Sequence, residues 1–458
     1  MKFKEIFKRV VSVAVAVALL LSLQRLLQPK YATSLREGSY TSQYYDEEKD
    51  HQVLMVGDCE LYENFDPITL WNNYGITSYI RGNAQQLTWQ SYYLLKEALK
   101  YEKPEVVVFN VMELSSDEPE KEEYNRLVLD NMKWSKEKVD AINASMMEDE
   151  EFIDYLFPIL RYHSRITELT SEDFDYYFKG KNNTIAGYYM RMDTKPYEVG
   201  AWGDENYVGK YTDEALASKE NAQEESENEE QIANTDEAEE EWSAEADVDE
   251  AEEEWSAEAD VEEEEEWSAE ADSDEGWSAE ADGDESSEEE WSAEADVEED
   301  EEFDDESDEE TEEVEPLGEN SMHYLDLIRT LCEENDIELL LVKAPSVSPK
   351  WYDEWDEEIV EYADKYNLNY INYLNLVDEI GIDYTTDTYD EGLHMNYQGA
   401  LKCADYLGQY LTENYNLKDL CLDKEISKVW EEKAKQQEEL KEAQLQELDK
   451  YGELRSYK

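Results

Sequence analysis

The sequence predicts an α/β protein in which helices cover a parallel sheet. Short apolar runs alternate with stretches of helical periodicity, and the runs at 52–56 and 106–109 are almost wholly apolar. Strands buried on both faces have this composition, and helices must then cover both faces. A further apolar run at 337–342 restores the pattern after a long interruption. We therefore expect one α/β domain split in sequence, with its parts at 51–215 and 318–415.

The first part of the domain shows a strand-helix-strand rhythm and then changes character. Its expected elements are strands at 52–56, 76–80 and 106–109, with a helix at 85–101. Residues 115–215 are rich in aromatic side chains and have helical stretches at 136–147 and 152–162. We expect these residues to form a helical elaboration over the sheet edge, with a strand at 187–192.

The second part repeats the rhythm and ends in a charged tail. The expected elements are a helix from the capping residues Asn320 or Ser321 to Glu334, strands at 337–342 and 370–373, and helices at 355–366 and 399–411. Residues 416–458 contain a charged stretch at 423–450 that is rich in Ala, Gln and Leu. This stretch predicts a solvated helix or a weak coiled coil.

The interruption between the two parts is strongly acidic. Residues 220–316 contain 52 Asp and Glu and no Lys or Arg, within a chain of 458 residues that has 121 acidic and 39 basic residues. The motif Trp-Ser-Ala-Glu-Ala-Asp occurs five times there, at irregular spacing. One Trp per dozen acidic residues buries too little surface to offset chain entropy, so we expect a disordered insert at 216–317.

The charge of the chain limits its partners. The formal net charge is −82, and the chain outside the insert is acidic as well. Both parts repel phosphate, which excludes a nucleic-acid-binding protein. Cations are the more reasonable partner for the acidic insert. The four cysteines match no zinc spacing and are too few for a disulfide framework, so we expect no metal site and no cofactor.

The N-terminus has the pattern of an exported, membrane-anchored protein. Basic residues within the first nine positions precede an apolar run at 10–23, which two leucines can extend to residue 27. About 20 apolar residues cross a bilayer, and no clear cleavage site follows. We favour an uncleaved signal-anchor at 1–27 over a removed signal peptide. A polar linker at 28–50 would then connect this single span to a domain outside the cytoplasm.

The residues with the clearest chemical potential lie more than 300 positions apart. Cys59 directly follows the first expected strand, and His394 is preceded by Asp390 and Glu391 in a loop before a helix. A nucleophile at a strand-to-helix turn, with a distant imidazole and carboxylate, is how many hydrolases are assembled. The alternative is a structural Cys and an unrelated loop His.

These residues resemble the SGNH/GDSL esterase family, block by block and in order. Gly57-Asp58-Cys59 resembles the Gly-Asp-Ser block, and Arg81-Gly82-Asn83 resembles the glycine block. Asn110 stands where the family carries its Asn block, and Asp390 to His394 resembles the terminal block. In style the chain is similar to the membrane-anchored envelope members that serve teichoic-acid D-alanylation and alginate O-acetylation. The resemblance implies a flavodoxin-like three-layer fold and acyl-ester chemistry.

The resemblance also implies roles for individual residues. Cys59 would be the nucleophile and His394 the base, while Gly82 N–H and the Asn110 side chain would bind the oxyanion, with Asn83 as a competing donor. The family's acidic residue stands three positions before the His, where this chain has Glu391. We favour Asp390, four positions before, because a loop glycine follows and permits an extra residue. Asp390 would orient the imidazole.

Two functions are compatible with this set of residues. The first is an acyl esterase or O-acyltransferase that acts on small acyl esters of an exported polysaccharide or a teichoic-type wall polymer. The second is a catalytically inactive scaffold that keeps the fold and partners a membrane-bound O-acyltransferase. The second follows from Cys59 itself, since the family nucleophile is Ser and replacement by Cys often accompanies loss of hydrolysis.

Overall fold

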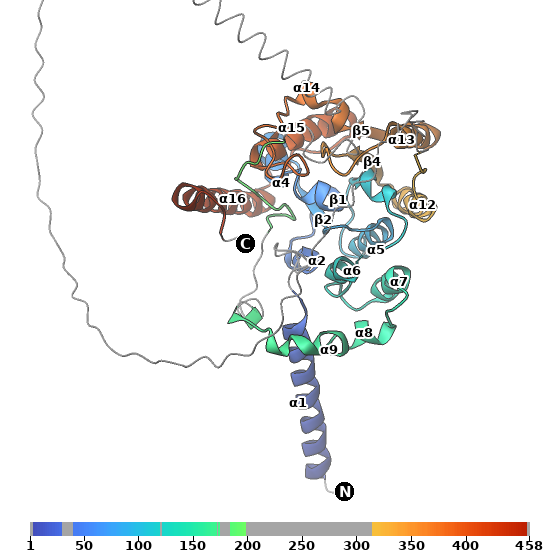
Figure 1. Cartoon of the computed structure of the whole chain (residues 1–458), viewed down its shortest axis with the longest axis vertical. Coiled ribbons are helices and arrows are strands. Elements are labelled where there is room, and N and C mark those ends of the chain that lie inside the picture. Colours follow the sequence, from blue (N-terminus) through green and yellow to red (C-terminus); the bar gives the residue numbers. More distant parts are fainter. Residues whose placement is uncertain are drawn as a thin grey trace, which may run out of the picture. The chain divides into compact units, whose positions relative to one another are not determined.

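The computed structural model describes residues 3–29, 40–119, 121–171, 173–174, 184–197 and 314–455 (Figure 1). Nearly all of the acidic insert predicted at 216–317, and residues 30–39 of the predicted linker, lie outside these ranges. Those two predictions therefore remain predictions.

Five parallel strands form the sheet, and the expected α/β class is confirmed. Their order is β2-β1-β3-β4-β5, which is the strand order of flavodoxin-like doubly wound sheets. The strands are β1 Val53–Gly57, β2 Ser78–Gly82, β3 Val106–Asn110, β4 Glu338–Lys343 and β5 Asn369–Asn372. Every residue of β1, β2 and β3 is buried, as the continuous apolar runs predict for a sheet with two covered faces.

Helices cover the two faces of this sheet (Figure 1). On one face α4 packs against α15, and on the other α5 packs against α12. The helices of the sheet domain are α3 Cys59–Tyr62, α4 Pro67–Tyr74, α5 Thr88–Ala98, α12 Glu319–Glu334, α13 Asp353–Tyr366, α14 Val377–Ile380 and α15 Tyr397–Asn414. The split domain is thus a single three-layer unit, because α12 to α15 come from the second part of the sequence.

The helical elaboration after β3 is present, but the strand expected at 187–192 is not. The additional elements are η2 Val111–Ser115, α6 Glu122–Leu129, α7 Lys136–Ser145, α8 Phe152–Leu156, α9 Ile159–Tyr162 and η3 His163–Thr167. At 185–188 only an isolated bridge forms, between Ile185 and Tyr188. The backbone turns at Ala186 and Gly187, with φ of 51° and 84°, and a Cβ on Gly187 would lie 2.1 Å from Ile80 O. A turn this tight cannot continue a strand.

The end of the predicted linker is part of the folded domain. Residues 40–46 form α2 (Tyr40–Gln43) and η1 (Tyr44–Asp46). The rings of Tyr40 and Tyr44 are buried and pack edge-on against Tyr62 and Tyr79, with centroids 5.2 and 5.3 Å apart. Burial of two aromatic rings outweighs the polar character that predicted a linker there.

The charged tail also differs from expectation. It forms one long helix, α16 (Lys424–Tyr451), which packs on the domain. Trp430 is fully buried and stacks on Trp71, with ring centroids 5.7 Å apart. Gln437 donates a hydrogen bond of 2.6 Å to Asp66 Oδ1. α16 is therefore neither a solvated helix nor a coiled coil.

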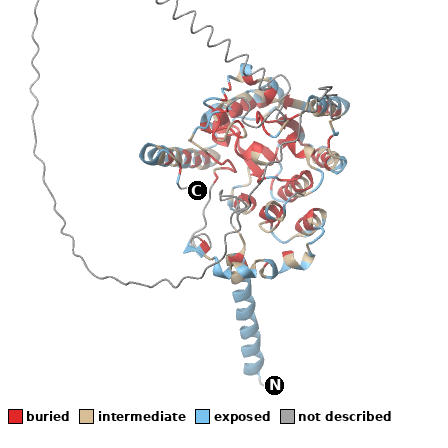
Figure 2. Cartoon of the chain, in the orientation of Figure 1, coloured by how far each residue is buried: buried red, intermediate tan, exposed pale blue. Residues whose placement is uncertain are grey.

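The N-terminal helix α1 (Phe3–Leu27) is long and apolar enough to cross a membrane, with a mean hydropathy of 2.2 over its most apolar window. Only Gln24 and Leu27 of this helix are buried, both near its C-terminal end (Figure 2). An apolar helix that the protein leaves uncovered needs another apolar environment, which agrees with the anchor expected at 1–27.

Candidate active site

The strand order reverses between β1 and β3, and the predicted nucleophile lies at that position. β1 ends at Gly57 and β3 at Asn110, and these strands are neighbours in the sheet. Two residues after β1 the chain reaches Cys59, the first residue of α3. In doubly wound sheets the crevice at the carboxyl ends of the strands, where the order reverses, is where ligands bind.

Asp58 fixes the turn that presents Cys59. Its carboxylate caps α3 by accepting a hydrogen bond of 3.0 Å from Glu60 N, and it accepts another of 2.7 Å from Asn110 Nδ2. Burial, reinforced by the nearby Glu60 carboxylate, raises the pKa of Asp58 to about 7. The side chain thus joins the ends of β1 and β3 directly beneath the thiol.

His394 comes to the Cys59 turn from the second part of the sequence. Asn64, which follows α3, accepts a hydrogen bond of 2.7 Å from Met395 N. The same side chain donates to Ser346 Oγ in the loop after β4, at 3.0 Å. Asn64 therefore fastens the His394 loop to the Cys59 turn, across 331 positions of sequence. No sequence pattern pointed to this residue.

Asp390 rather than Glu391 holds the imidazole. Asp390 Oδ2 lies 2.6 Å from His394 Nδ1, and Oδ1 accepts a hydrogen bond of 2.7 Å from His394 N. Glu391 and Gly392 both have positive φ, 65° and 88°. This backbone turn accommodates one residue more between the acid and the His than the three-position spacing of the family. The Glu391 carboxylate pairs instead with Lys195 Nζ at 2.8 Å.

Cys59 and His394 interact, and the ring keeps one nitrogen that Asp390 does not occupy. With Nδ1 occupied, Nε2 is the remaining ring nitrogen, and it is buried without a hydrogen-bond partner among the described residues. His394 is close enough to Cys59 to stabilise the thiolate electrostatically. The structure therefore brings together the Cys, the His and one carboxylate of the predicted set.

A second carboxylate, Glu63, was not found from the sequence. Its Oε2 lies 3.8 Å from His394 Nδ1 and accepts a hydrogen bond from the Tyr389 hydroxyl. The Tyr389 ring stacks on the imidazole, with centroids 6.0 Å apart and planes 17° apart. Glu63 is buried, so its charge acts on the ring through a medium of low dielectric. In a chain with this many acidic residues, a lone Glu gives no sequence signal.

The electrostatics of the pair set its resting protonation. Burial raises the pKa of the half-buried Cys59 thiol to about 12, although His394 opposes that rise. Burial alone would lower the pKa of His394, but Glu63 and Asp390 outweigh it and raise the pKa well above its usual value. Both shifts favour the thiol form of Cys59 and the protonated form of the imidazole.

The three predicted oxyanion donors differ in availability. Gly82 ends β2 opposite Gly57, and a Cβ there would lie 3.0 Å from Gly57 O, so only glycine permits this close approach. Asn110 uses one Nδ2 hydrogen on Asp58 and keeps the other, while its Oδ1 is buried without a partner among the described residues. Asn83 is committed elsewhere.

The commitment of Asn83 is structural. Its Oδ1 accepts from Thr41 Oγ1 at 3.2 Å, and its Nδ2 donates to Gln86 Oε1 at 2.9 Å. Both ends of the amide are thus engaged in holding α2 and the turn after β2. Its Nδ2 keeps a second hydrogen, as that of Asn110 does, so Asn83 remains a competing donor that also has a structural role.

A buried ion pair lies next to the Cys59 turn. Lys343 Nζ, at the end of β4, lies 2.8 and 3.0 Å from the two carboxylate oxygens of Glu60. Both side chains are buried, and Lys343 also donates to Ala344 O at 2.9 Å. Glu60 follows Cys59 in α3, so this pair ties the nucleophile turn to β4. No sequence pattern pointed to this ion pair.

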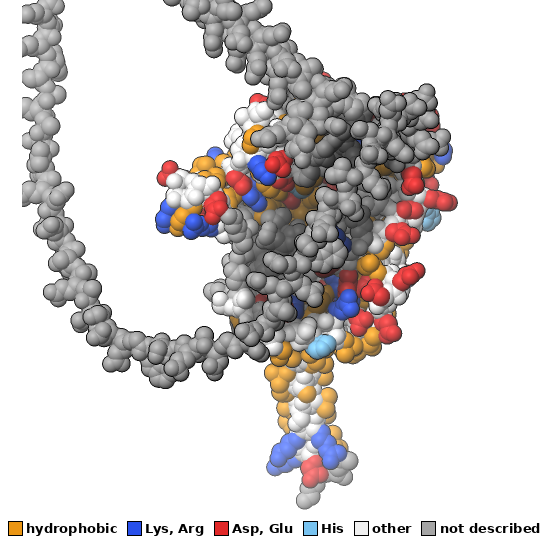
Figure 3. Space-filling view, in the orientation of Figure 1, with side chains coloured by type: hydrophobic (Ala, Val, Ile, Leu, Met, Phe, Trp, Pro, Cys, Tyr) orange, Lys and Arg blue, Asp and Glu red, His pale blue; other side chains and the backbone are white. Residues whose placement is uncertain are grey.

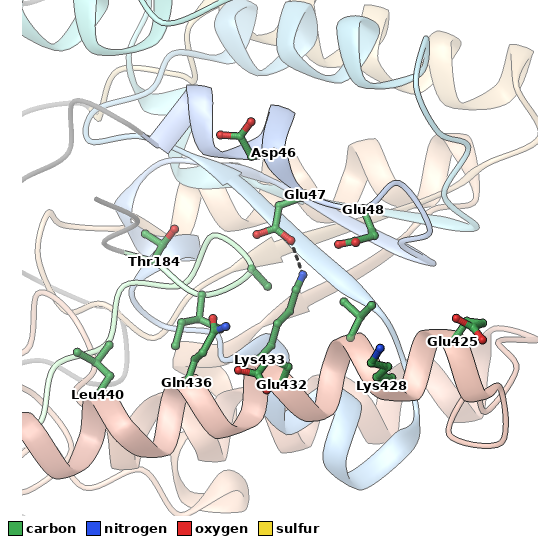
Figure 4. A pocket seen from close by; sticks show the side chains of 13 residues that line it. Asp46, Glu47, Glu48, Thr184, Glu425, Lys428, Glu432, Lys433, Gln436 and Leu440 are labelled. Atoms are coloured by element: carbon green, nitrogen blue, oxygen red, sulfur yellow. Dashed lines mark hydrogen bonds and ion pairs between the residues drawn. The ribbon is translucent and has the colours of Figure 1, made fainter. Parts of the chain in front are cut away.

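A hollow of about 580 Å³ lies elsewhere, along α16 and η1 (Figure 4). Its charged side chains are mostly carboxylates, and none of the candidate catalytic or oxyanion-binding residues lines it. Among the described residues, no group of three or more His, Cys, Asp or Glu side chains is arranged to hold a metal ion. All four cysteines are free, and Cys332 lies in the core as expected.

No protein-family model matches the sequence, and neither the curated proteins nor the solved structures contain a match to it.

Proposed function

We propose that the protein is an envelope-anchored, SGNH-like acyl esterase or O-acyltransferase. Its substrates would be small acyl esters on an exported polysaccharide or a teichoic-type wall polymer. The observation that carries the proposal is the meeting of Cys59, His394 and Asp390 at the carboxyl ends of the strands, with the imidazole oriented by a 2.6 Å hydrogen bond. The resemblance of the four sequence blocks to SGNH esterases supplies the type of reaction.

The proposed reaction has two halves. Cys59 Sγ attacks the acyl carbonyl as its proton passes to His394 Nε2, and the carbonyl oxygen becomes an oxyanion. The oxyanion collapses, the alcohol leaves with the proton from His394, and a thioester remains on Cys59. In the second half, His394 takes a proton from water or from an acceptor hydroxyl, which attacks the thioester and releases the thiol.

Two donors are proposed for the oxyanion. The free Nδ2 hydrogen of Asn110 and the Gly82 N–H come from strands on either side of β1, as the resemblance implies. Donors fixed by the backbone need no reorganisation as charge develops, which makes such groups effective. Asp390 stabilises the protonated imidazole throughout.

The N-terminal helix determines where in the cell the proposed reaction would take place. With α1 in the cell membrane as a single span, the domain would work outside the cytoplasm, next to exported polymers. A membrane-bound O-acyltransferase is the proposed partner if the acyl group arrives through the membrane. The acidic insert, outside the described residues, could bind cations.

A single substitution tests the chemistry. Cys59→Ala should abolish turnover of an acyl-ester reporter by the full chain, because no thioester can form. A thiol-reactive acyl probe should label the wild type at Cys59, and labelling should slow in His394→Ala. Turnover that survives in Cys59→Ala would overturn the proposed mechanism.

One observation favours a second candidate, the inactive scaffold that partners a membrane O-acyltransferase. Burial raises the pKa of the Cys59 thiol to about 12, so the thiolate is scarce unless His394 draws off the proton. The scaffold predicts that Cys59 is not labelled by the acyl probe and that Cys59→Ala leaves cellular polymer acylation unchanged. Rapid labelling that depends on His394 would exclude it.

A further inference from the structure

We propose that the segment Phe152–Thr167, named here the collar, rests on the surface of the same membrane that α1 crosses. The collar comprises α8, α9 and η3, and it lies across the C-terminal end of α1 (Figure 1). This inference rests on α1 being in a bilayer, and it is independent of any chemistry at Cys59.

The collar exposes large apolar side chains that the domain does not cover. Five of them are between 38 and 58 % exposed: Ile153, Leu156, Phe157, Leu160 and Ile166. Figure 3 shows apolar side chains gathered where α1 meets this part of the domain. A surface with this density of exposed apolar residues marks a contact with a partner or with lipid.

Contacts with α1 fix the level of the collar. Both α9 and η3 contact α1, and Arg165 Nη1 donates a hydrogen bond of 2.6 Å to Leu27 O. The apolar part of α1 runs from Val10 to Leu27, after the charged residues of its first two turns, and at 1.5 Å per residue it spans about 27 Å, close to the thickness of a hydrocarbon core. Leu27 ends this part, so the residues that contact it lie at the boundary between hydrocarbon and headgroups.

The charge of the collar suits a membrane surface as well. Its 16 residues contain one acidic side chain, Asp154, and two arginines, Arg161 and Arg165, in a chain whose formal net charge is −82. An anionic leaflet would repel most of this chain but not the collar. Amphipathic helices that lie in the interface have this composition, with apolar residues on one side and Arg or Lys on the other.

A hollow between α1 and the collar is placed at the same level. It measures about 570 Å³ and is lined by Leu21 of α1, by Trp134, and by Leu156 and Pro158 of the collar. Trp side chains favour the boundary between hydrocarbon and water, where an apolar ring and a polar N–H are both satisfied. The exit of the anchor, the collar and this Trp therefore all indicate a bilayer surface as the occupant.

Photocrosslinking of the full chain in lipid nanodiscs tests the proposal. The photoreactive amino acid p-benzoylphenylalanine replaces Leu160 in one variant, and Leu445 of α16 in a matched control. Leu160 is 51 % and Leu445 45 % exposed, so accessibility alone predicts equal labelling. In nanodiscs of phosphatidylethanolamine and phosphatidylglycerol we expect about tenfold more lipid adduct at position 160, by mass spectrometry, because only the collar lies in the interface.

Two outcomes would overturn the proposal. Equal lipid adducts at 160 and 445 would place the collar away from the bilayer. In cell membranes, a protein adduct at 160 in place of a lipid adduct would assign the collar to a protein partner.

A double substitution with the probe at a different position makes the test independent of the probe at Leu160. Leu156→Ser with Leu160→Ser should reduce lipid adducts from a probe at Ile166, while the melting temperature in detergent stays unchanged, since both side chains are exposed. Every variant that stays in the nanodisc fraction has α1 in the bilayer, whatever the position of the collar. Hydrolysis of a soluble acyl ester depends on Cys59 and not on the collar. A failure of the proposed chemistry is therefore distinguished from a failure of the membrane proposal.

Discussion

The imidazole of His394 lies among two carboxylates of different kinds. Asp390 is partly exposed and makes two hydrogen bonds, one to the ring and one to the backbone of the same residue. Glu63 is buried and contacts the ring only at 3.8 Å. The first carboxylate sets the orientation of the ring, and the second acts on its charge. Separate substitutions can therefore distinguish positioning from electrostatics.

Asp390→Asn should lower kcat/KM for an acyl-ester reporter by roughly a hundredfold or more, because an amide no longer holds the reactive tautomer. Glu391→Gln is the matched control, since Glu391 pairs with Lys195 away from the ring. Steady-state kinetics on both variants check the expectation. A larger loss in Glu391→Gln than in Asp390→Asn would contradict the orientation described for this loop.

The pH dependence of activity should reflect the raised pKa of His394. The proposed base acts only when deprotonated, so kcat/KM should still be rising with pH above neutrality. Glu63→Gln removes a buried negative charge, lowers the pKa of His394 and should move the rising limb to lower pH by about one unit. The profile of kcat/KM against pH measures the shift. A limb that stays in place would mean that Glu63 does not act on the imidazole.

At the scale of elements, α16 packs on the domain although its sequence is mostly polar. Gln444 donates a hydrogen bond of 2.9 Å to Met190 O, and Lys433 pairs with Glu47. These polar side chains satisfy backbone and carboxylate groups that the domain would otherwise leave buried and unpaired. Trp430 supplies the apolar contact at the N-terminal half of the helix.

Trp430→Ala should therefore lower the free energy of unfolding by about 3–5 kcal/mol, the usual effect of removing a buried aromatic ring. Leu445→Ala, on the same helix but 45 % exposed, should change it by less than about 0.5 kcal/mol. Chemical denaturation followed by circular dichroism measures both. A stability unchanged by Trp430→Ala would show that α16 does not hold the domain together.

The sequence predicted some elements well and others poorly, for physical reasons. Continuous apolar runs placed β1, β3 and β4 within a residue or two, because buried parallel strands leave little other composition. The strand expected at 187–192 failed because a turn at Gly187 depends on its contact with Ile80 O, which only tertiary structure sets. The position of Cys59 and His394 followed from strand ends and loops, whereas Glu63 and Lys343 are ordinary charged residues until folding buries them.

At the scale of the whole molecule, the buried carboxyl groups couple stability to pH. Burial raises the pKa of Asp58 to about 7, and it also raises the pKa values of Glu63, Asp66, Glu113 and Asp130. The folded chain then binds more protons than the unfolded chain between the usual and the raised pKa values. Stability must fall as pH rises through that range. The raised pKa of His394 acts in the same direction above its unfolded value near 6.5.

The melting temperature should consequently be higher near pH 6 than near pH 8.5, at constant ionic strength. Differential scanning calorimetry of the full chain measures the difference. Asp58→Asn should reduce it, since this group no longer titrates, whereas replacement of the exposed Glu319 by Gln should not. A melting temperature that increased with pH would contradict the raised pKa values of these carboxyl groups.

The pairing of β3 with β4 has a consequence for how the chain is made. These strands are neighbours in the sheet, yet about 230 residues separate them along the chain. At 5–20 residues per second, a ribosome needs roughly 10–45 seconds to deliver the second strand after the first. For that time the half-built sheet presents an unpaired strand edge, the kind of surface that recruits other nascent chains. The polyanionic stretch is synthesised within the same interval, and mutual repulsion between copies would protect the unfinished domain from aggregation.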